Sequence, residues 1–189
     1  PKKQLIEAKK IVQAYYKYDN HWNKAGAFYA YQALIQSING QLQNNKAHLL
    51  TSNEVELKQS QTNGGNLANM IGLDKLLHET EYSYVVRNQK STNGVKRNYP
   101  ITPGFAYEDE YEMVSVNSDT TLPKALIIRD SYCVALMPYL NESFREVVYI
   151  FDAWQYKLNM DIVEKEKPNV VILQIFEPHI SNILDNLSR

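Results

Sequence analysis

The chain has 189 residues, of which 44% are apolar and 22% are charged, and its formal net charge is −1. This composition is that of a globular protein long enough for one hydrophobic core, so we expect a single domain over residues 1–189. The nearly balanced charges argue against nucleic-acid binding, which needs a clustered basic surface. No stretch approaches the roughly 20 uninterrupted apolar residues of a membrane span.

The first residue and the cysteine content bear on where the protein works. The sequence starts at Pro1 rather than at a methionine, and we interpret it as a fragment of a longer chain. Cys133 is the only cysteine, so no disulfide can form within the chain. Composition alone therefore leaves the compartment open.

The first half of the chain is predicted to be helical and polar. Apolar residues recur at helical spacing near the start, and Asn23 is suited to cap a second helix that Asn39-Gly40 would end. A polar stretch follows, broken by Gly64-Gly65. The elements expected in this half are helices at residues 3–15, 24–38 and 66–77 and a strand at residues 82–87.

From Lys124 onward, short apolar runs alternate with helical patterns. Such alternation implies a parallel sheet covered by helices on both faces. The expected fold class is therefore α/β, with a three-layer α/β/α architecture and a mostly parallel sheet. The elements expected in this half are strands at residues 113–116, 125–129, 147–151 and 170–175 and helices at residues 132–140, 156–167 and 178–187.

Ser131 is the first candidate for chemistry. It follows the apolar run at residues 126–128 and directly precedes a predicted helix. Such a junction places a side chain at the carboxyl edge of the sheet, where open α/β sheets bind ligands, beside the N–H groups of the first helical turn. A simple helix cap by Asp130 and Ser131 is the alternative.

Asp19 and His21 are the candidates that complement a nucleophilic serine. Such a serine needs a base, and the base needs a carboxylate that holds its tautomer. The two residues are two positions apart on one loop, although a merely solvated loop fits the same sequence. His179 competes as the base because it follows a predicted strand at the same sheet edge. No matching ligand spacing accompanies His21, so no metal is expected.

Several segments resemble, in the same order, the alginate O-acetyltransferase group (AlgJ and AlgX) and the related DHHW proteins. Residues 19–22 are similar to their Asp-x-His-Trp motif, and residues 129–132 are similar to their Gly-Asp-Ser-Phe segment. Arg129 stands where these proteins usually have glycine, and Asn66 stands where an aspartate is expected. The resembling segments are residues 15–27, 65–73, 127–132, 137–147 and 167–172.

The resemblance implies an SGNH-hydrolase-like fold with a permuted motif order. Ser131 would be the nucleophile, His21 its base and Asp19 the orienter of that base. Backbone N–H groups near Ser131 and Tyr132, with a second donor from residues 64–66, are the expected oxyanion donors. The residues expected to bind substrate are Trp22, Asn66, Arg129 and Tyr132.

Arg129 follows an apolar strand, and an unpaired buried charge is very costly. Its guanidinium is therefore expected either at the rim of the Ser131 cleft or paired with an acid such as Asp130.

The resemblance also implies a function. We expect transfer of an acetyl group to or from a cell-surface or secreted polysaccharide, through an acetyl-serine intermediate and without a metal or organic cofactor. The implied location is extracytoplasmic, at a bacterial envelope or surface, with an anchor in a missing N-terminal segment and a membrane-bound protein as acyl donor. The alternative is a non-catalytic carbohydrate-binding or assembly module that keeps the fold, and Arg129 is the feature that favours it.

Overall fold

The computed structural model describes residues 1–155 and 158–181, and the chain divides into two compact units. Unit 1 contains the N-terminal part of the chain, Pro1–Gln43 and Leu49–Gln89, together with Ala135–Leu140. Unit 2 contains Lys90–Val134, the short segment Asn44–His48 and the chain after residue 140. Among the described residues, no helix is both long and apolar enough to cross a membrane.

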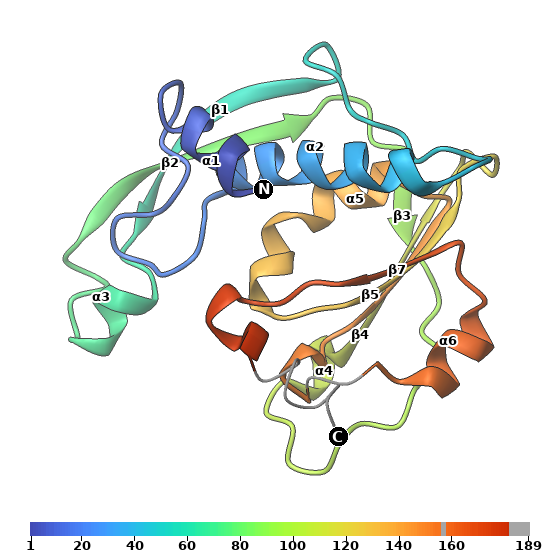
Figure 1. The fold of residues 1–189 in the computed structure, drawn as a ribbon. Coiled ribbons are helices and arrows are strands. Elements are labelled where there is room, and N and C mark those ends of the chain that lie inside the picture. Colours follow the sequence, from blue (N-terminus) through green and yellow to red (C-terminus); the bar gives the residue numbers. More distant parts are fainter. Residues whose placement is uncertain (156–157, 182–189) are drawn as a thin grey trace. The chain divides into compact units, whose positions relative to one another are not determined.

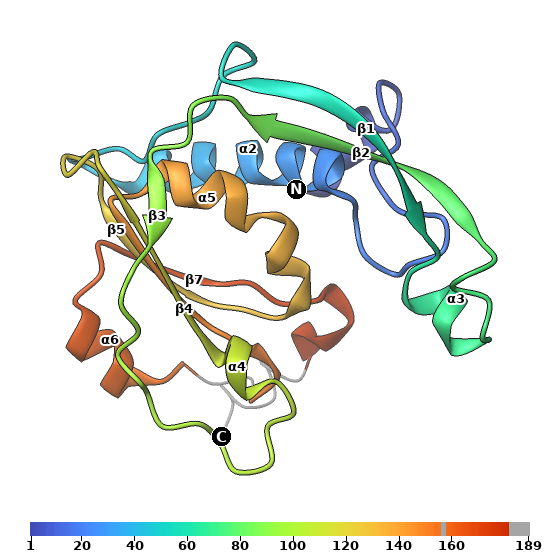
Figure 2. The same cartoon turned by 180° about the vertical axis from the view of Figure 1, so that it is seen from behind.

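Unit 1 combines helices with a two-stranded antiparallel ribbon (Figure 1). Its elements are α1 (Lys2–Ala8), α2 (Lys24–Gln41), β1 (Val55–Asn63), α3 (Asn66–Met70) and β2 (His78–Val86). Strands β1 and β2 pair along their whole length, from the pair Val55–Val86 to the pair Asn63–His78. Helix α3 lies in the connection between the two strands, at the far end of the ribbon (Figure 2).

Asn23 caps α2, as the sequence predicts. Its side-chain oxygen accepts a hydrogen bond from the Gly26 N–H at 2.9 Å, and its Nδ2 donates to the Gln13 carbonyl at 2.6 Å. The side chain is completely buried. This cap fixes where the helix begins and also ties its first turn to the preceding chain.

An aromatic cluster that contains the buried Phe28 and Tyr139 forms part of the core of unit 1. The Phe28 ring lies 4.6 Å from the Tyr84 ring and 5.2 Å from the Tyr139 ring, measured between centroids. The Tyr139 hydroxyl is 2.9 Å from the Lys24 carbonyl oxygen and 2.8 Å from the Tyr84 carbonyl oxygen. A buried tyrosine needs such a partner for its polar tip.

Unit 2 is built on a five-stranded sheet. Its strands are β3 (Ser91–Asn93), β4 (Glu112–Asn117), β5 (Lys124–Ile128), β6 (Glu146–Ile150) and β7 (Val170–Leu173), in the spatial order β3-β4-β6-β5-β7. Strand β5 pairs in parallel with both β6 and β7, whereas β4 pairs antiparallel with β3 and β6. The α-helices after β3 are α4 (Glu108–Tyr111), α5 (Met137–Ser143), which crosses from unit 1 into unit 2, and α6 (Met160–Glu166).

The prediction that helices and strands combine in an α/β fold is confirmed, but the prediction of a mostly parallel sheet is wrong, because the sheets are mixed and antiparallel. Only residues 118–123 connect β4 to β5. A parallel connection needs a crossover of a dozen or more residues, so β4 runs opposite to β5 and β6. The second sheet, β1 with β2, is antiparallel throughout.

One face of the mixed sheet carries a continuous apolar cluster. Ile162 of α6 is buried against this face, and Asn159 caps that helix by accepting from the Ile162 N–H at 3.3 Å. The other buried members are Tyr99, Tyr111, Val114, Leu126, Ile128, Val148 and Ile150. Strands β5 and β6 pair in parallel beneath this cluster, so the chain leaves both strands at the same carboxyl edge of the sheet.

Several predicted helices are shorter in the structure. The helix expected at residues 66–77 is only α3, and the one expected at residues 132–140 is a 3₁₀ helix, Ser131–Ala135, followed by α5. At the C-terminal end, a 3₁₀ turn covers Glu177–His179. The rest of the helix expected at residues 178–187, from residue 182 on, and positions 156–157 of another expected helix lie outside the described residues.

Candidate functional site

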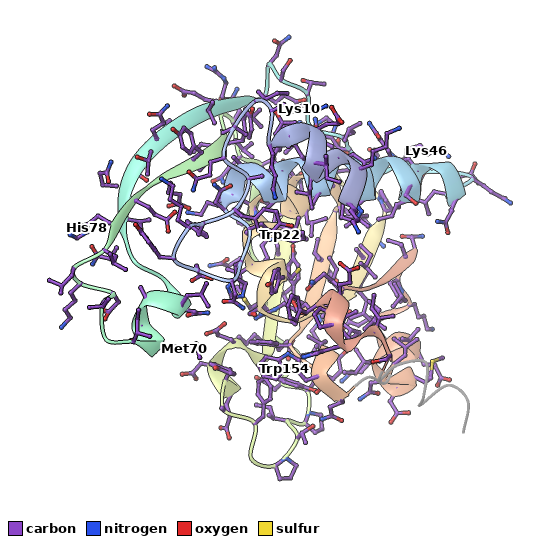
Figure 3. The ribbon with its side chains drawn as sticks, turned by 60° about the vertical axis from the view of Figure 1, so that its left-hand side comes forward. Lys10, Trp22, Lys46, Met70, His78 and Trp154 are labelled. Carbon is purple, nitrogen blue, oxygen red and sulfur yellow. The ribbon has the colours of Figure 1, made fainter. Side chains whose placement is uncertain are left out.

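Asp19 and His21 lie on a closed loop in unit 1. An antiparallel bridge between Tyr15 and Trp22 closes the loop at its base, and the Asn23 N–H donates to the Ala14 carbonyl at 3.1 Å. Trp22 is labelled in Figure 3, just before the start of α2. Because α2 begins directly after this bridge, the helix holds the end of the loop.

The two side chains form a hydrogen-bonded pair. His21 Nδ1 lies 2.6 Å from Asp19 Oδ1, and the His21 backbone N–H donates to the same oxygen at 2.9 Å. Both side chains are largely buried, with 19% of His21 and 16% of Asp19 exposed. The carboxylate favours the tautomer with its proton on Nδ1, which leaves the lone pair on Nε2, as a general base requires.

The other oxygen of Asp19 is held by the start of α3. The Asn66 N–H donates to Asp19 Oδ2 at 2.8 Å. Burial of Asp19 opposes ionisation, but the hydrogen bonds from the Asn66 and His21 backbone N–H groups and from the His21 ring outweigh it. Together they hold the pKa of Asp19 below its ordinary value of 3.8. Asp19 is therefore an anion at neutral pH.

Gly65 makes this contact possible. A Cβ atom at this position would lie 2.1 Å from Asp19 Oδ2 and 2.5 Å from Asp19 Cβ. Only glycine allows the backbone to approach the carboxylate so closely. The sequence indicates a break at Gly64-Gly65 and, through the resemblance, an oxyanion donor at residues 64–66, but nothing local indicates that Asp19 lies against Gly65.

Ser131 begins a 3₁₀ helix in unit 2, with only Arg129 and Asp130 between it and the end of β5, at the strand-to-helix junction that the sequence predicts, and it is half-buried. The preceding residue, Asp130, is 1% exposed. Its carboxylate accepts from the Tyr132 N–H at 2.9 Å and from the Phe176 N–H at 2.6 Å. Asp130 therefore ties the segment after β5 to the segment after β7.

Two of the backbone N–H groups expected as oxyanion donors, those of Tyr132 and Asn66, donate to side chains of the protein. The Tyr132 N–H donates to Asp130, and the Asn66 N–H donates to Asp19. The Tyr132 ring stacks on Phe176, with centroids 4.8 Å apart. Asn66 also donates through its side chain to Asn20 at 3.1 Å. In this structure Asn66 and the backbone of Tyr132 thus hold the two candidate segments in place.

Arg129 does not occupy the cleft rim that was one of the two expectations. It is completely buried, and its guanidinium lies 4.0 Å from the centre of the Phe151 ring. It donates to the Glu110 carbonyl at 2.9 Å and lies 3.8 Å from the Glu110 carboxylate. The acid that it pairs with is therefore Glu110, whereas it contacts Asp130 only at the backbone carbonyl, at 3.4 Å. Burial lowers the pKa of the Arg129 guanidinium below its ordinary value.

Each unit thus contains some of the residues that the sequence predicts for the site. In unit 1, Asn66 holds Asp19 beside His21, and in unit 2 Arg129 and Tyr132 flank the Asp130-Ser131 pair. The rival base His179 lies in unit 2, after β7, with its ring 5.6 Å from that of Phe176. In the described part of the chain, no group of three or more His, Cys, Asp or Glu residues is placed to hold a metal ion.

Asp152 at the same sheet edge was not singled out from the sequence. It follows β6, and burial raises its pKa to about 6. Carboxylates with raised pKa values are enriched at functional sites, but a single aspartate after a strand carries no such signal in the sequence.

Comparisons with known proteins agree with this fold. Bacillus cereus PatB1, solved with a sulfonyl adduct, has a TM-score of 0.66 and 20% identity over 90% of this chain and 63% of that chain. A DHHW family protein from Eubacterium siraeum has a TM-score of 0.64 and 17% identity over 91% and 61% of the two chains. This chain therefore spans less than two thirds of either protein, and the likeness establishes the fold alone. No curated protein sequence matches the chain.

A family profile matches residues 2–101, more than half of the chain, including Asp19, His21 and Asn66. The family is described as an SGNH hydrolase-like domain, acetyltransferase AlgX. The chain therefore belongs to the SGNH hydrolase-like AlgX family.

Proposed function

We propose that this chain catalyses serine-dependent acyl transfer, with Ser131 as the nucleophile, His21 as the base and Asp19 as its orienter. The observation that carries the proposal is the 2.6 Å contact between His21 Nδ1 and an Asp19 that is held in its ionised form. A carboxylate in this position orients the ring and stabilises the imidazolium that forms during catalysis. The acetyltransferase description of the family supports acetyl as the acyl group.

The reaction has two steps. Ser131 Oγ attacks the carbonyl carbon of an acetyl ester while His21 accepts the hydroxyl proton. The ester bond then breaks, and His21 returns the proton to the departing alcohol, which leaves an acetyl-serine. In the second step a sugar hydroxyl, or water in an esterase, attacks the acetyl carbon of the acetyl-serine while His21 accepts its proton. The bond between that carbon and Ser131 Oγ then breaks, and His21 returns the proton to Ser131 Oγ, which releases the acetylated sugar or acetate.

The acceptor and the setting belong to the same proposal. The family resemblance supports a cell-surface or secreted polysaccharide as the substrate, a membrane-bound acyl donor protein as the partner and an extracytoplasmic location. The small net charge supports the expectation that nucleic acid is not a partner.

A sulfonyl fluoride tests the nucleophile directly, because PatB1 was solved with a sulfonyl adduct. We expect phenylmethanesulfonyl fluoride to add one sulfonyl group to the protein, detected by intact mass and mapped to Ser131 by peptide sequencing. Ser131→Ala should lose the adduct, whereas Ser118→Ala, a change at an exposed serine of unit 2, should keep it. An adduct that persists in Ser131→Ala would contradict the assignment.

Ester hydrolysis tests whether Ser131, His21 and Asp19 act together. Purified protein should hydrolyse 4-nitrophenyl acetate, and Ser131→Ala and His21→Ala should each reduce kcat to nearly the same residual rate. The double variant should be no slower than either, because residues that act together are not additive. Asp19→Asn should cost less than either change. Multiplicative losses in the double variant would mean that Ser131 and His21 act separately.

The alternative function, a non-catalytic glycan-binding module, rested on Arg129. Because Arg129 is buried and bonded to Glu110, its presence is explained by support of the strand end. Glycan binding by a protein that shows neither sulfonylation nor ester hydrolysis would favour the module instead.

A further inference from the structure

We propose that Glu79 is the positioning residue of the Asp19–His21 pair, a role that rests on the proposed function. Glu79 lies on β2, is 4% exposed and belongs to none of the motifs considered above. Its carboxylate holds the backbone of the two residues directly before Asp19.

Three donors converge on this carboxylate. Glu79 Oε2 accepts from the Lys17 N–H at 2.7 Å and from Gln13 Nε2 at 3.2 Å. Glu79 Oε1 accepts from the Tyr18 N–H at 3.1 Å. These donors belong to the chain that enters the Asp19–His21 loop, so β2 holds the entry of the loop while α2 holds its exit.

Tyr18 is held from both sides. While its N–H donates to Glu79, its carbonyl accepts from the Leu67 N–H at 3.1 Å and from the Ala68 N–H at 3.2 Å. These two donors belong to the first turn of α3, where N–H groups lack partners within the helix. The peptide units on both sides of Tyr18 are thus fixed, and the second of them leads directly into Asp19.

The chemistry of the three donors points to positioning rather than to charge pairing. All three are neutral N–H groups. Burying a carboxylate is costly, and neutral donors offset this cost less well than a cation does. A carboxylate is nevertheless suited to this place. Both of its oxygens accept hydrogen bonds from several directions, and neither carries a hydrogen that would face the N–H groups of the loop.

Glu79→Gln tests this role with almost no change in shape. Its amide keeps one acceptor oxygen but turns an NH₂ group toward the N–H of Lys17 or Tyr18, so at least one backbone bond is lost. Glu81→Gln is the matched control. Glu81 lies two residues further along β2 and accepts from the Tyr16 side chain at 2.5 Å, not from the loop backbone.

The first measurement is the tautomer of His21. Ring nitrogen chemical shifts are recorded by NMR at pH 8.5, where an ordinary histidine is neutral, with His21→Ala to assign the signal among the four histidines. We expect the Nδ1–H tautomer in the wild type and in Glu81→Gln, and a mixture of tautomers in Glu79→Gln. If His21 in folded Glu79→Gln keeps the single Nδ1–H tautomer of the wild type, the proposal is overturned.

The second measurement is ester hydrolysis. Glu79→Gln should lower kcat by about tenfold or more, because small displacements of catalytic groups have large effects, and should change KM by less than about twofold. Wild-type kcat in Glu79→Gln would also overturn the role.

If the wild-type protein hydrolyses no ester, the proposed function fails, while the tautomer still decides whether Glu79 positions the pair. If Glu79→Gln does not fold, Glu79→Asp, which keeps the charge but shortens the reach, is measured in the same way with the same expected tautomer mixture.

Discussion

At the scale of single residues, the Asp19 carboxylate depends on a neighbour that has no side chain. Gly65→Ala would place a methyl group about where Asp19 Oδ2 now lies, with a separation of only 2.1 Å. We expect Asp19 to be displaced and kcat for a small acetyl ester to fall by on the order of 100-fold. Steady-state kinetics measures this loss.

Gly40→Ala is the control for Gly65. Gly40 lies near the end of α2, and a Cβ atom there would have nothing within 4 Å. Alanine favours a helix by about 0.5–1 kcal/mol over glycine, so this variant should be as stable as the wild type or more so, with unchanged kcat. Equal kinetics for both alanine variants would show that Asp19 tolerates the displacement.

Arg129 presents the opposite situation, a large buried side chain at the position where the motif that residues 129–132 resemble leads us to expect glycine. Arg129→Gly removes the guanidinium from the Phe151 ring and from the Glu110 carbonyl and leaves a cavity. We expect a loss of about 3 kcal/mol in the free energy of unfolding, measured with urea. Arg129→Lys keeps the charge without the planar fork and should lose an intermediate amount. An unchanged midpoint in Arg129→Gly would refute the supporting role.

At the scale of elements, the cap of α2 serves both the helix and the loop before it. Asn23→Ala loses the bond to Gly26 and also the bond to the Gln13 carbonyl. We expect a loss of about 1–2 kcal/mol in urea denaturation, together with a lower kcat, because α2 holds the exit of the Asp19–His21 loop.

Asn159→Ala removes a similar cap from α6 in unit 2. This change should lower stability by about 1 kcal/mol and leave kcat nearly unchanged, since α6 does not hold the loop. A fall in kcat of the same size in both variants would show that lower stability, and not the loop, accounts for the loss.

The elements also show which parts of the fold a sequence reveals. Strands β5 and β6 are almost entirely buried, so their apolar runs were predictable within a residue or two. Strand β1 was missed because all but its first residue are polar or exposed, and only pairing with β2 makes it a strand. The single helix expected at residues 132–140 is not observed, because the chain turns at Leu136, just before Met137-Pro138 begins a second helix.

The candidate site likewise contains residues that the sequence reveals and residues that it does not. Asp19 and His21 are two residues apart, so a local motif was sufficient to find them. The residues that support them come from far along the chain: Asn66 is 47 positions from Asp19, and Glu79 is 61 positions from Tyr18. These contacts exist only once β1 and β2 have paired, and no local pattern encodes that pairing.

At the scale of the whole molecule, acidic and basic residues nearly balance, with 21 Asp and Glu against 20 Lys and Arg. Acid therefore removes paired charges and also makes the chain increasingly cationic, and both changes oppose the folded state. The ion pairs around Glu166, at one edge of the unit 2 sheet, are the clearest place to measure this loss of stability in acid. Glu166, with a 3% exposed side chain, lies 2.6 Å from Lys124 Nζ and 3.2 Å from Arg97 Nε, and it also accepts from the Tyr99 hydroxyl.

Glu166 should therefore contribute stability that depends on pH. Burial raises its pKa, but the bonds from Lys124 and Tyr99 outweigh burial and leave the pKa below the ordinary 4.5. A lowered pKa gives stability that is fully present above about pH 4.5 and is lost as the pH falls through the folded value. In urea denaturation, Glu166→Gln should be less stable than the wild type at pH 7, and the two should converge toward pH 3. Glu7→Gln, which breaks an exposed pair with Lys10, should stay within about 0.5 kcal/mol of the wild type at every pH. A constant difference between Glu166→Gln and the wild type from pH 7 to pH 3 would mean that packing, not ionisation of Glu166, supplies the stability.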